Sequence, residues 1–363
     1  MTDQGGITYS LKFQARALAH HQGDRVNSKW VVGTNALREE NEIRVLQYDP
    51  DQERLLSVAA YHHPPEIWSI TSSASSEDLF LTVWSKAGVY GVSLWRAHSN
   101  SSLIQEAELD GHTTTVRSAL WHSQQQNLAL TVEEGGIRSW DINASMVKSS
   151  GFASSGELLQ LWSGMLHPHN PSVAVTAGGQ NLQLWDLRSM SMTSQTSTAH
   201  RMPTRDVCFA SHDEYRVVSG GDDCKLCFWD TRMLGRNEAV LVLGGHSHWV
   251  WKAQFNPFYD QLIASSSSDS LVNLFHTPHL NSTATATAAA APAGDLGSGT
   301  QSKATASRSG DVDGKVHTYD EHEDSVYGLA WSAADPWLFA TLSYDGRVVI
   351  NKVPKSVKYK VLL

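Results

Sequence analysis

Cysteine and histidine are the side chains of this sequence with the chemistry to bind a metal, and their spacing argues against a metal site. Cys224 and Cys227 have the two-residue gap of a zinc knuckle. A tetrahedral zinc site needs four ligands, however, and no second pair occurs at a suitable spacing. We therefore expect no metal and no cofactor, and interpret the remaining histidine pairs as solvated residues in loops or at strand ends. These pairs are His20 with His21, His62 with His63, and His167 with His169.

The short motifs of common enzyme classes are missing from the sequence. It contains no G-x-S-x-G nucleophile elbow, no G-x-x-x-x-G-K phosphate loop and no H-E-x-x-H metal motif. This absence favours a non-enzymatic protein. A hydrolase built on a propeller stays open as an alternative, because such an active site assembles from scattered loops and leaves faint sequence traces.

Thirteen tryptophans are spread along the chain, and their spacing predicts the fold. Seven positions lie at the end of an alternating apolar segment, at intervals of 44 to 48 residues except for a last interval of 75. They are Gln47, Trp95, Trp140, Trp185, Trp229, Phe275 and Ile350. A period near 45, in units of short alternating strands, is the signature of WD repeats with four strands per blade. We predict an all-β fold, a single seven-bladed WD-repeat β-propeller over residues 1–363.

Histidine and aspartate recur in step with these positions. Four histidines lie 28 or 29 residues before Trp140, Trp229, Phe275 and Ile350, and three aspartates lie in tight turns five or six residues before the last three. These residues are His112, His200, His246 and His322, with Asp223, Asp269 and Asp345. In WD repeats such a histidine, aspartate and tryptophan form a buried hydrogen-bonded set with a strand serine, which favours a structural role over a catalytic one. The third and fourth repeats depart from the pattern at residues 133–136 and 177–180.

Two segments near the end of the chain need separate interpretations. Residues 279–315 are rich in Ala, Thr, Ser and Gly and account for the longest interval. They bury too little apolar area to offset their ordering entropy, so we predict a low-complexity, disordered insertion before the last blade. Residues 357–363 alternate apolar and basic side chains, which predicts the outer strand of the blade that carries Ile350.

Composition and charge restrict the partners. The chain has 363 residues, is 41% hydrophobic and carries a formal net charge of −9, which offers no general affinity for nucleic acid. No run approaches the roughly 18 apolar residues of a membrane span, and the first residues lack the pattern of a signal peptide. Three cysteines fit a reducing compartment. We expect a cytoplasmic, monomeric propeller without membrane insertion.

Aromatic and basic residues cluster at the predicted start of the inner strands. In each repeat an aliphatic residue opens this strand, such as Val250, with Val207 as its equivalent in the preceding repeat. Because side chains alternate along a strand, the residues beside it ring one end of the channel. Trp, Tyr and Arg dominate binding hot spots, whereas packing between blades is the alternative for any single tryptophan. The candidate protein-binding residues are Trp68, Arg117, Trp162, Asp206, Trp249, Trp251 and Tyr327.

Several longer strings resemble one family. They are LKFQARAL, EIWSI, GGDDCKLCFWDTR, HSHWVW, EHEDSVYGLAWSAADPWLFATLSYDGRVVINKVP and the ending KYKVLL. Together they are similar to the EARP and GARP complex-interacting protein family, WD-repeat partners of vesicle-tethering complexes. The likeness covers nearly the whole chain and is densest after residue 200. The Ala-, Thr- and Ser-rich insertion is a departure, since this segment tends to be acidic in the family.

The resemblance implies a non-enzymatic adaptor or scaffold that binds subunits of the EARP and GARP tethering complexes. It further implies a peripheral location on endosomes and the trans-Golgi network, with a role in endosomal recycling and retrograde vesicle transport. A cargo receptor remains an alternative, because the generic repeat also resembles the peroxisomal receptor for amino-terminal targeting signals.

Overall fold

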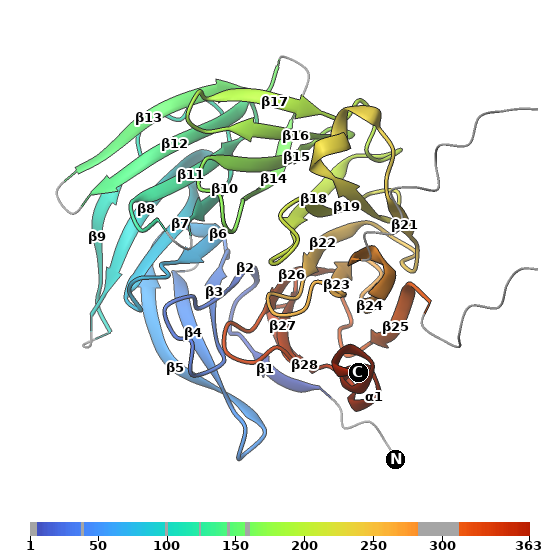
Figure 1. Ribbon diagram of the computed structural model, residues 1–363. Helices are drawn as coiled ribbons and strands as arrows, with labels where there is room; N and C mark the ends of the chain where they lie inside the picture. Colours follow the sequence, from blue (N-terminus) through green and yellow to red (C-terminus); the bar gives the residue numbers. More distant parts are fainter. Residues whose placement is uncertain are drawn as a thin grey trace, which may run out of the picture.

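Seven antiparallel sheets of four strands each surround one axis in the computed structural model (Figure 1). The structure describes residues 6–37, 40–98, 101–122, 125–143, 146–156, 160–281 and 312–363. Each sheet is one blade, and its first strand lies nearest the axis, in contact with the first strands of both neighbouring blades. The seven-bladed, all-β prediction is confirmed.

The strands of each blade follow one another from the axis outward, except that the outermost strand of blade 7 comes from the start of the chain. The bounds are β2 (Ala15–His20), β3 (Lys29–Thr34), β4 (Asn41–Asp49) and β5 (Arg54–His63) in blade 1; β6 (Glu66–Ser72), β7 (Leu79–Lys86), β8 (Val89–Ala97) and β9 (Leu103–Glu108) in blade 2; β10 (Val116–Trp121), β11 (Leu128–Glu133), β12 (Gly136–Asn143) and β13 (Met146–Ser154) in blade 3; β14 (Leu161–Leu166), β15 (Val173–Gly178), β16 (Asn181–Asp186) and β17 (Ser191–Gln195) in blade 4; β18 (Thr204–Phe209), β19 (Arg216–Gly221), β20 (Leu226–Asp230) and β21 (Leu241–Leu243) in blade 5; β22 (Val250–Phe255), β23 (Leu262–Ser267), β24 (Val272–His276) and β25 (Gly314–Tyr319) in blade 6; and β26 (Val326–Trp331), β27 (Leu338–Ser343), β28 (Arg347–Lys352) and β1 (Ile7–Ser10) in blade 7.

The hydrophobic core lies between adjacent blades. Val218 and Phe228 of blade 5, for example, pack against Val250 and Phe255 of blade 6. This arrangement requires apolar side chains on both faces of the middle strands, which is why β19, β20, β23 and β24 are buried almost throughout. Each blade is therefore stabilised by its neighbours, and the ring has to close.

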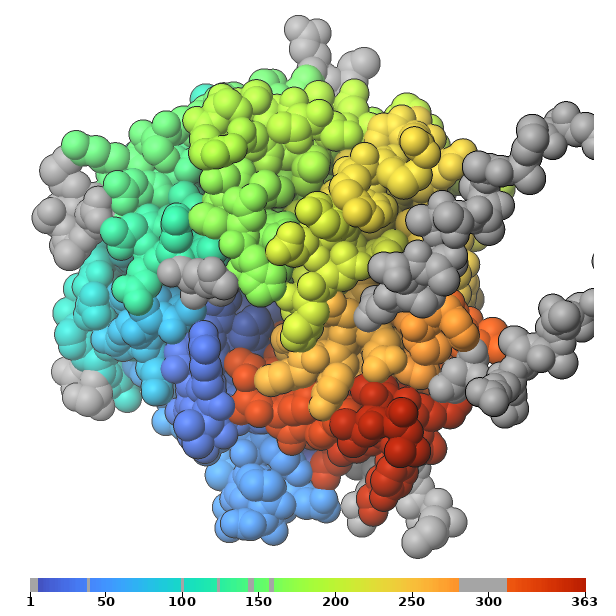
Figure 2. All heavy atoms as spheres, viewed as in Figure 1, coloured from blue at the N-terminus to red at the C-terminus, as the bar shows by residue number. Residues whose placement is uncertain are grey.

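Closure is achieved by the start of the chain. Strand β1 pairs antiparallel with β28, with Ile7 opposite Ile350 and Tyr9 opposite Val348. In Figure 2 the red end of the sequence accordingly lies against the blue beginning. The prediction that residues 357–363 form this outer strand is wrong, because β1 already occupies the edge of β28.

Residues Lys355–Leu362 instead form helix α1. Val357 and Val361, four residues apart, share one helical face and pack with Trp337 in the cluster between blades 6 and 7. Lys358 lies 5.3 Å from the Trp337 ring centroid. The sequence V-K-Y-K-V satisfies a period of two as well as this i, i+4 spacing, and the buried contact decides between them. No helix within the described residues is long and apolar enough to cross a membrane.

The predicted insertion is shorter than its assigned bounds. The 3-10 helix η2 (Pro278–Asn281) and strand β25, which begins at Gly314, fold the two ends of segment 279–315 into blade 6. The rest of the predicted insertion, residues 282–311, lies outside the described residues. A second 3-10 helix, η1 (Thr231–Arg236), follows the third strand of blade 5.

The repeat landmarks are displaced by one residue in two of the three blades that lack a tryptophan there, blades 1 and 7. Trp229 pairs with Val217, the second residue of β19. The matching partner of Phe339 in blade 7 is Asn351, not Ile350. In blade 1 the partner of Trp30 is likewise Leu46, not Gln47. A shift of one residue moves a side chain to the opposite face of the strand, so Gln47 and Ile350, which were chosen from the sequence, lie on the other face.

Candidate functional site

Blade 5 contains the complete hydrogen-bonded set of histidine, aspartate, serine and tryptophan that the sequence predicts. His200, just before β18, contacts Asp223 Oδ1 through Nδ1 at 2.9 Å and Ser219 Oγ through Nε2 at 2.8 Å. The Trp229 indole donates to the same Ser219 oxygen at 2.9 Å. A carboxylate only accepts, so His200 carries its proton on Nδ1 and accepts from the serine hydroxyl. The residues form one chain of hydrogen bonds that fixes a loop and a turn to the strands.

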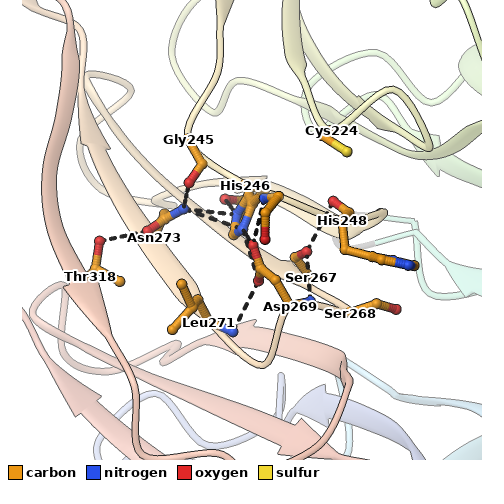
Figure 3. A network of polar contacts seen from close by, with 12 residues as sticks. Cys224, Gly245, His246, His248, Ser267, Ser268, Asp269, Leu271, Asn273 and Thr318 are labelled. Atoms are coloured by element: carbon orange, nitrogen blue, oxygen red, sulfur yellow. Dashed lines mark hydrogen bonds and ion pairs between the residues drawn. The ribbon is translucent and has the colours of Figure 1, made fainter.

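Blade 6 has a similar network around His246, drawn in Figure 3. His246 Nδ1 lies 3.0 Å from Asp269 Oδ2, and its Nε2 lies 2.7 Å from Ser265 Oγ. Asn273 donates to the Gly245 carbonyl at 3.0 Å. Burial alone would raise the pKa of Asp269, but hydrogen bonds from His246 and the Ser247 amide hold it well below its ordinary value. Phe275 replaces the tryptophan of blade 5 and supplies no indole donor.

Blades 3 and 7 depart from this arrangement. His112 contacts Glu133 at 3.1 Å, so a strand glutamate takes the place of the turn aspartate. In blade 7, His322 contacts Thr341 at 2.8 Å, while its buried Nδ1 has no hydrogen-bond partner in the described part of the chain. The predicted partner, Asp345, accepts from Ser343 and from the Arg347 amide instead. Burial lowers the pKa of His322 to about 4.

Other blades keep part of the set. Trp95, Trp140 and Trp185 each donate to a threonine in the neighbouring strand of the same blade. In blade 2, Thr82 accepts from the Trp95 indole and also contacts His63. The assignment as solvated histidines is wrong for His21 and His167, which are buried, and for His63, which is fully buried. His63 stands 32 residues before Trp95, outside the spacing used in the search, but its position just before an inner strand is the signal that identifies it.

No group of three or more metal-ligating side chains is arranged to hold a metal ion within the described residues. Cys227 points into the blade core, where burial raises the pKa of its thiol to about 12. Cys224 lies in the preceding turn with a positive φ of 63°. The two sulfurs thus belong to different environments, a strand core and a turn, despite their short spacing in sequence.

One residue near the start of each inner strand, the second residue in six blades and the third in blade 2, lies at one end of the propeller axis. In every blade the strand pairing skips this residue, which forms a β-bulge that turns its side chain out of the ladder. All seven side chains are half-buried. We call them the inner-strand ring: Arg16, Trp68, Arg117, Trp162, Arg205, Trp251 and Tyr327.

Arginine and aromatic residues alternate around the inner-strand ring. The Arg205 guanidinium lies 4.3 Å from the Trp162 ring centroid and 5.2 Å from that of Trp251. Arg117 covers Trp162 at 4.2 Å. Such cation–π contacts hold flat side chains side by side. They fix the aromatic faces before any partner arrives.

The remaining members complete the circle. Trp251 and Tyr327 are adjacent, with centroids 4.8 Å apart. Arg16 lies 4.4 Å from the Tyr327 centroid and 5.4 Å from each of the Trp68 and Trp251 centroids. Trp249, which is 40% exposed, packs edge-on against Trp251 with centroids 6.0 Å apart. It extends the aromatic surface outward on blade 6.

Asp206 does not belong to this surface, and its prediction as a protein-binding residue is wrong. It is buried and accepts hydrogen bonds from Ser163 Oγ at 2.7 Å, Lys252 Nζ at 2.9 Å and the Ala253 amide at 3.1 Å. It therefore links blade 5 to both neighbouring blades. The sequence alignment was displaced by three residues, because Thr204, not Val207, opens the inner strand.

Two ring arginines were missed for identifiable reasons. Arg205 was hidden by the displaced alignment of blade 5. Arg16 lies in blade 1, which has neither a histidine before its inner strand nor a tryptophan at the landmark position. Trp68, Arg117, Trp162, Trp251 and Tyr327 do lie together in the ring, and Trp249 lies beside it.

Comparisons with known proteins agree with this architecture. The EIPR1 beta-propeller family model matches residues 3–275, and a WD domain, G-beta repeat matches residues 313–350. The rat and human proteins named EARP and GARP complex-interacting protein 1 are each 33% identical to this chain over the full length of both. The Arabidopsis thaliana WD repeat-containing protein DWA2 is 34% identical over 96% of each chain. The chain therefore belongs to the EARP and GARP complex-interacting protein family.

Proposed function

We propose that this propeller binds the EARP and GARP tethering complexes through the inner-strand ring and Trp249. The observation that carries the proposal is the ring itself: seven half-buried arginine and aromatic side chains at equivalent positions, with an exposed tryptophan beside them. Such residues combine large contact area with polar groups and dominate protein interfaces. The names of the related rat and human proteins supply the identity of the partner.

The proposed role is that of a non-enzymatic adaptor in endosomal recycling and retrograde vesicle transport. The tethering complexes would hold the protein at endosomes and the trans-Golgi network, without insertion of the propeller into the membrane. The buried His–Asp–Ser–Trp set of blade 5 supports this role, because its side chains are committed to one another within the blade.

A truncation at the exposed end of the surface tests the proposal. Trp249→Ala and Trp251→Ala should each weaken binding of purified EARP complex at least tenfold, because truncation of a hot-spot residue costs about 2 kcal/mol or more. Tyr359→Ala is the control, since Tyr359 is exposed on α1, away from the ring. Binding is measured by biolayer interferometry and folding by thermal unfolding.

The result separates binding from packing. If Trp251→Ala lowers the free energy of unfolding by roughly 3 to 5 kcal/mol and leaves the affinity of the folded fraction unchanged, Trp251 belongs to the core between blades. If both tryptophan variants bind the complex as wild type does, the proposed surface is wrong. Co-purification of peroxisomal import factors instead of tether subunits would favour a cargo receptor.

A further inference from the structure

Two of the three ring arginines are neutralised within their own blade. Arg205 forms a bidentate pair with Asp222, with Nε and Nη2 at 2.7 and 2.6 Å from the carboxylate oxygens. Arg117 forms an ion pair with Glu134. Both acids occupy the same place in the fold, the residue directly after the second strand of the blade. The sheet register thus places a carboxylate beside each of these guanidinium groups.

Arg16 has no such partner. The residue at the equivalent place in blade 1 is Asn35, directly after β3. No Asp or Glu oxygen lies within ion-pair distance of Arg16 in the described part of the chain. The buried Oδ1 of Asn35 also lacks a hydrogen-bond partner there. Blade 1 therefore presents an arginine and an amide where blades 3 and 5 present ion pairs.

The surroundings of Arg16 make this positive charge costly. Burial lowers the pKa of Arg16, and the charges of Arg117 and Arg205 lower it further, while Tyr327 opposes them. A guanidinium nonetheless stays protonated in proteins. It has lost part of its hydration and gained aromatic neighbours, but no anion. A carboxylate from outside would supply the missing partner.

We propose that Arg16 is a specificity-determining residue that binds the carboxylate of an aspartate or glutamate side chain in the partner. The acidic side chain belongs to an extended segment whose apolar neighbours pack on Trp68, Trp251 and Tyr327. Only the identity of the partner rests on the proposed function. The occupant is a single carboxylate because one ring arginine is free, and the chain's net charge of −9 opposes polyanions such as nucleic acid or an acidic membrane.

Asn35→Asp provides the sharpest test of this assignment. It supplies blade 1 with the carboxylate that Asp222 supplies to Arg205, so it should neutralise Arg16 while keeping the arginine and its stacking. We expect affinity for purified EARP complex to fall about 10- to 100-fold, in line with the loss of a charge-assisted hydrogen bond. Thermal stability should stay level or rise. Arg16→Gln should weaken binding by a similar factor.

Arg188→Gln is the matched control. It removes the same charge from an exposed arginine in the turn between β16 and β17. Its affinity should stay within twofold of wild type. If Asn35→Asp and Arg16→Gln both bind the complex as tightly as the wild type does, the Arg16 assignment is wrong and the proposed function stays intact.

A second experiment tests Arg16 without the tethering complex. A library of random heptapeptides, displayed without a free carboxyl end, is selected on the immobilised full chain. We expect enrichment of Asp or Glu next to apolar residues, and loss of that enrichment on Asn35→Asp. Amidated synthetic copies of the selected peptides should bind the wild type at least tenfold more tightly than Asn35→Asp. Absence of enrichment, peptides without an acid, or equal binding to both proteins would overturn the assignment.

Discussion

Blades 5 and 1 solve the same structural problem in different ways. Blade 5 satisfies the histidine of its repeat and its ring arginine internally, through the His200 chain of hydrogen bonds and the Arg205–Asp222 pair. Among the described residues, blade 1 has no histidine-centred chain of this kind, and its Trp30 indole donates across the ring closure to the Ala330 carbonyl of blade 7 at 3.0 Å. These two polar sets are therefore satisfied within blade 5, whereas the Trp30 indole of blade 1 depends on blade 7, and Arg16 has no acidic partner in the described part of the chain.

Equivalent positions of the repeat therefore differ in function, as Arg205 of blade 5 and Arg16 of blade 1 illustrate. A polar side chain that is satisfied within its blade stabilises the fold and has little left to offer a partner. An unsatisfied one at the same position adds little to stability but is free to select a ligand. The variants below test this division, starting with the largest expected loss of stability.

Removal of strand β1 should have the largest effect. Deletion of residues up to Ser10 exposes the edge of β28 and opens the contact between blades 7 and 1. We expect the free energy of unfolding to fall by about 4 kcal/mol, from roughly 1 kcal/mol for each of the lost backbone hydrogen bonds. Urea denaturation followed by tryptophan fluorescence measures the change.

Val242→Ala serves as the comparison for β1, because Val242 is an exposed side chain in β21, the outer strand of blade 5. It should alter stability by less than about 0.5 kcal/mol. Equal stability of the β1 deletion and the full chain would show that pairing with β28 does not close the ring.

Ser219→Ala should destabilise blade 5 by about 2 to 4 kcal/mol. It leaves both His200 Nε2 and the Trp229 indole buried without their hydrogen-bond partner, and each such group costs about 1 to 3 kcal/mol. Chemical denaturation measures the loss. Ser219→Thr keeps the hydroxyl and should recover most of the stability; a loss as large as that of alanine would show that packing, not hydrogen bonding, dominates at this position.

The free energy of unfolding should depend on pH because of His322 in blade 7, whose Nδ1 has no hydrogen-bond partner among the described residues. Burial lowers the pKa of His322 to about 4, from an ordinary value of 6.5. The unfolded chain therefore binds a proton at a higher pH than the folded chain. The contribution of neutral His322 to the free energy of unfolding is complete above pH 6.5 and is lost as pH falls toward 4. About 2 kcal/mol of it is lost by pH 5.

His322→Gln removes this titration, so the difference in stability between pH 7 and pH 5 should shrink by about 2 kcal/mol relative to wild type. Urea denaturation at the two pH values provides the measurement. An unchanged pH dependence in His322→Gln would mean that the pKa of His322 is the same in the folded and the unfolded protein.

The sequence predicted the propeller because tryptophans at a 45-residue period mark the repeats directly. It failed where a blade lacks those markers and where a local pattern fits two alternative assignments. Blade 1 offered no landmark, so Arg16 was missed, and Asp206 was misplaced because Val207 and Thr204 both suit the start of a strand. Helix α1 was missed because V-K-Y-K-V fits two periods. In each case a contact between distant segments, absent from any local pattern, decides the outcome.

Hydrogen–deuterium exchange of the full chain, with and without purified EARP complex, tests the account's central claim most directly. Bound complex should slow exchange at the segments that begin the inner strands and carry the ring, above all 14–17, 203–206, 248–252 and 325–328. The Asn35→Asp protein should lose this protection at concentrations that still protect the wild type. Protection confined to outer strands such as β9 or β17, with the inner-strand segments unchanged, would contradict the claim that the ring is the binding surface.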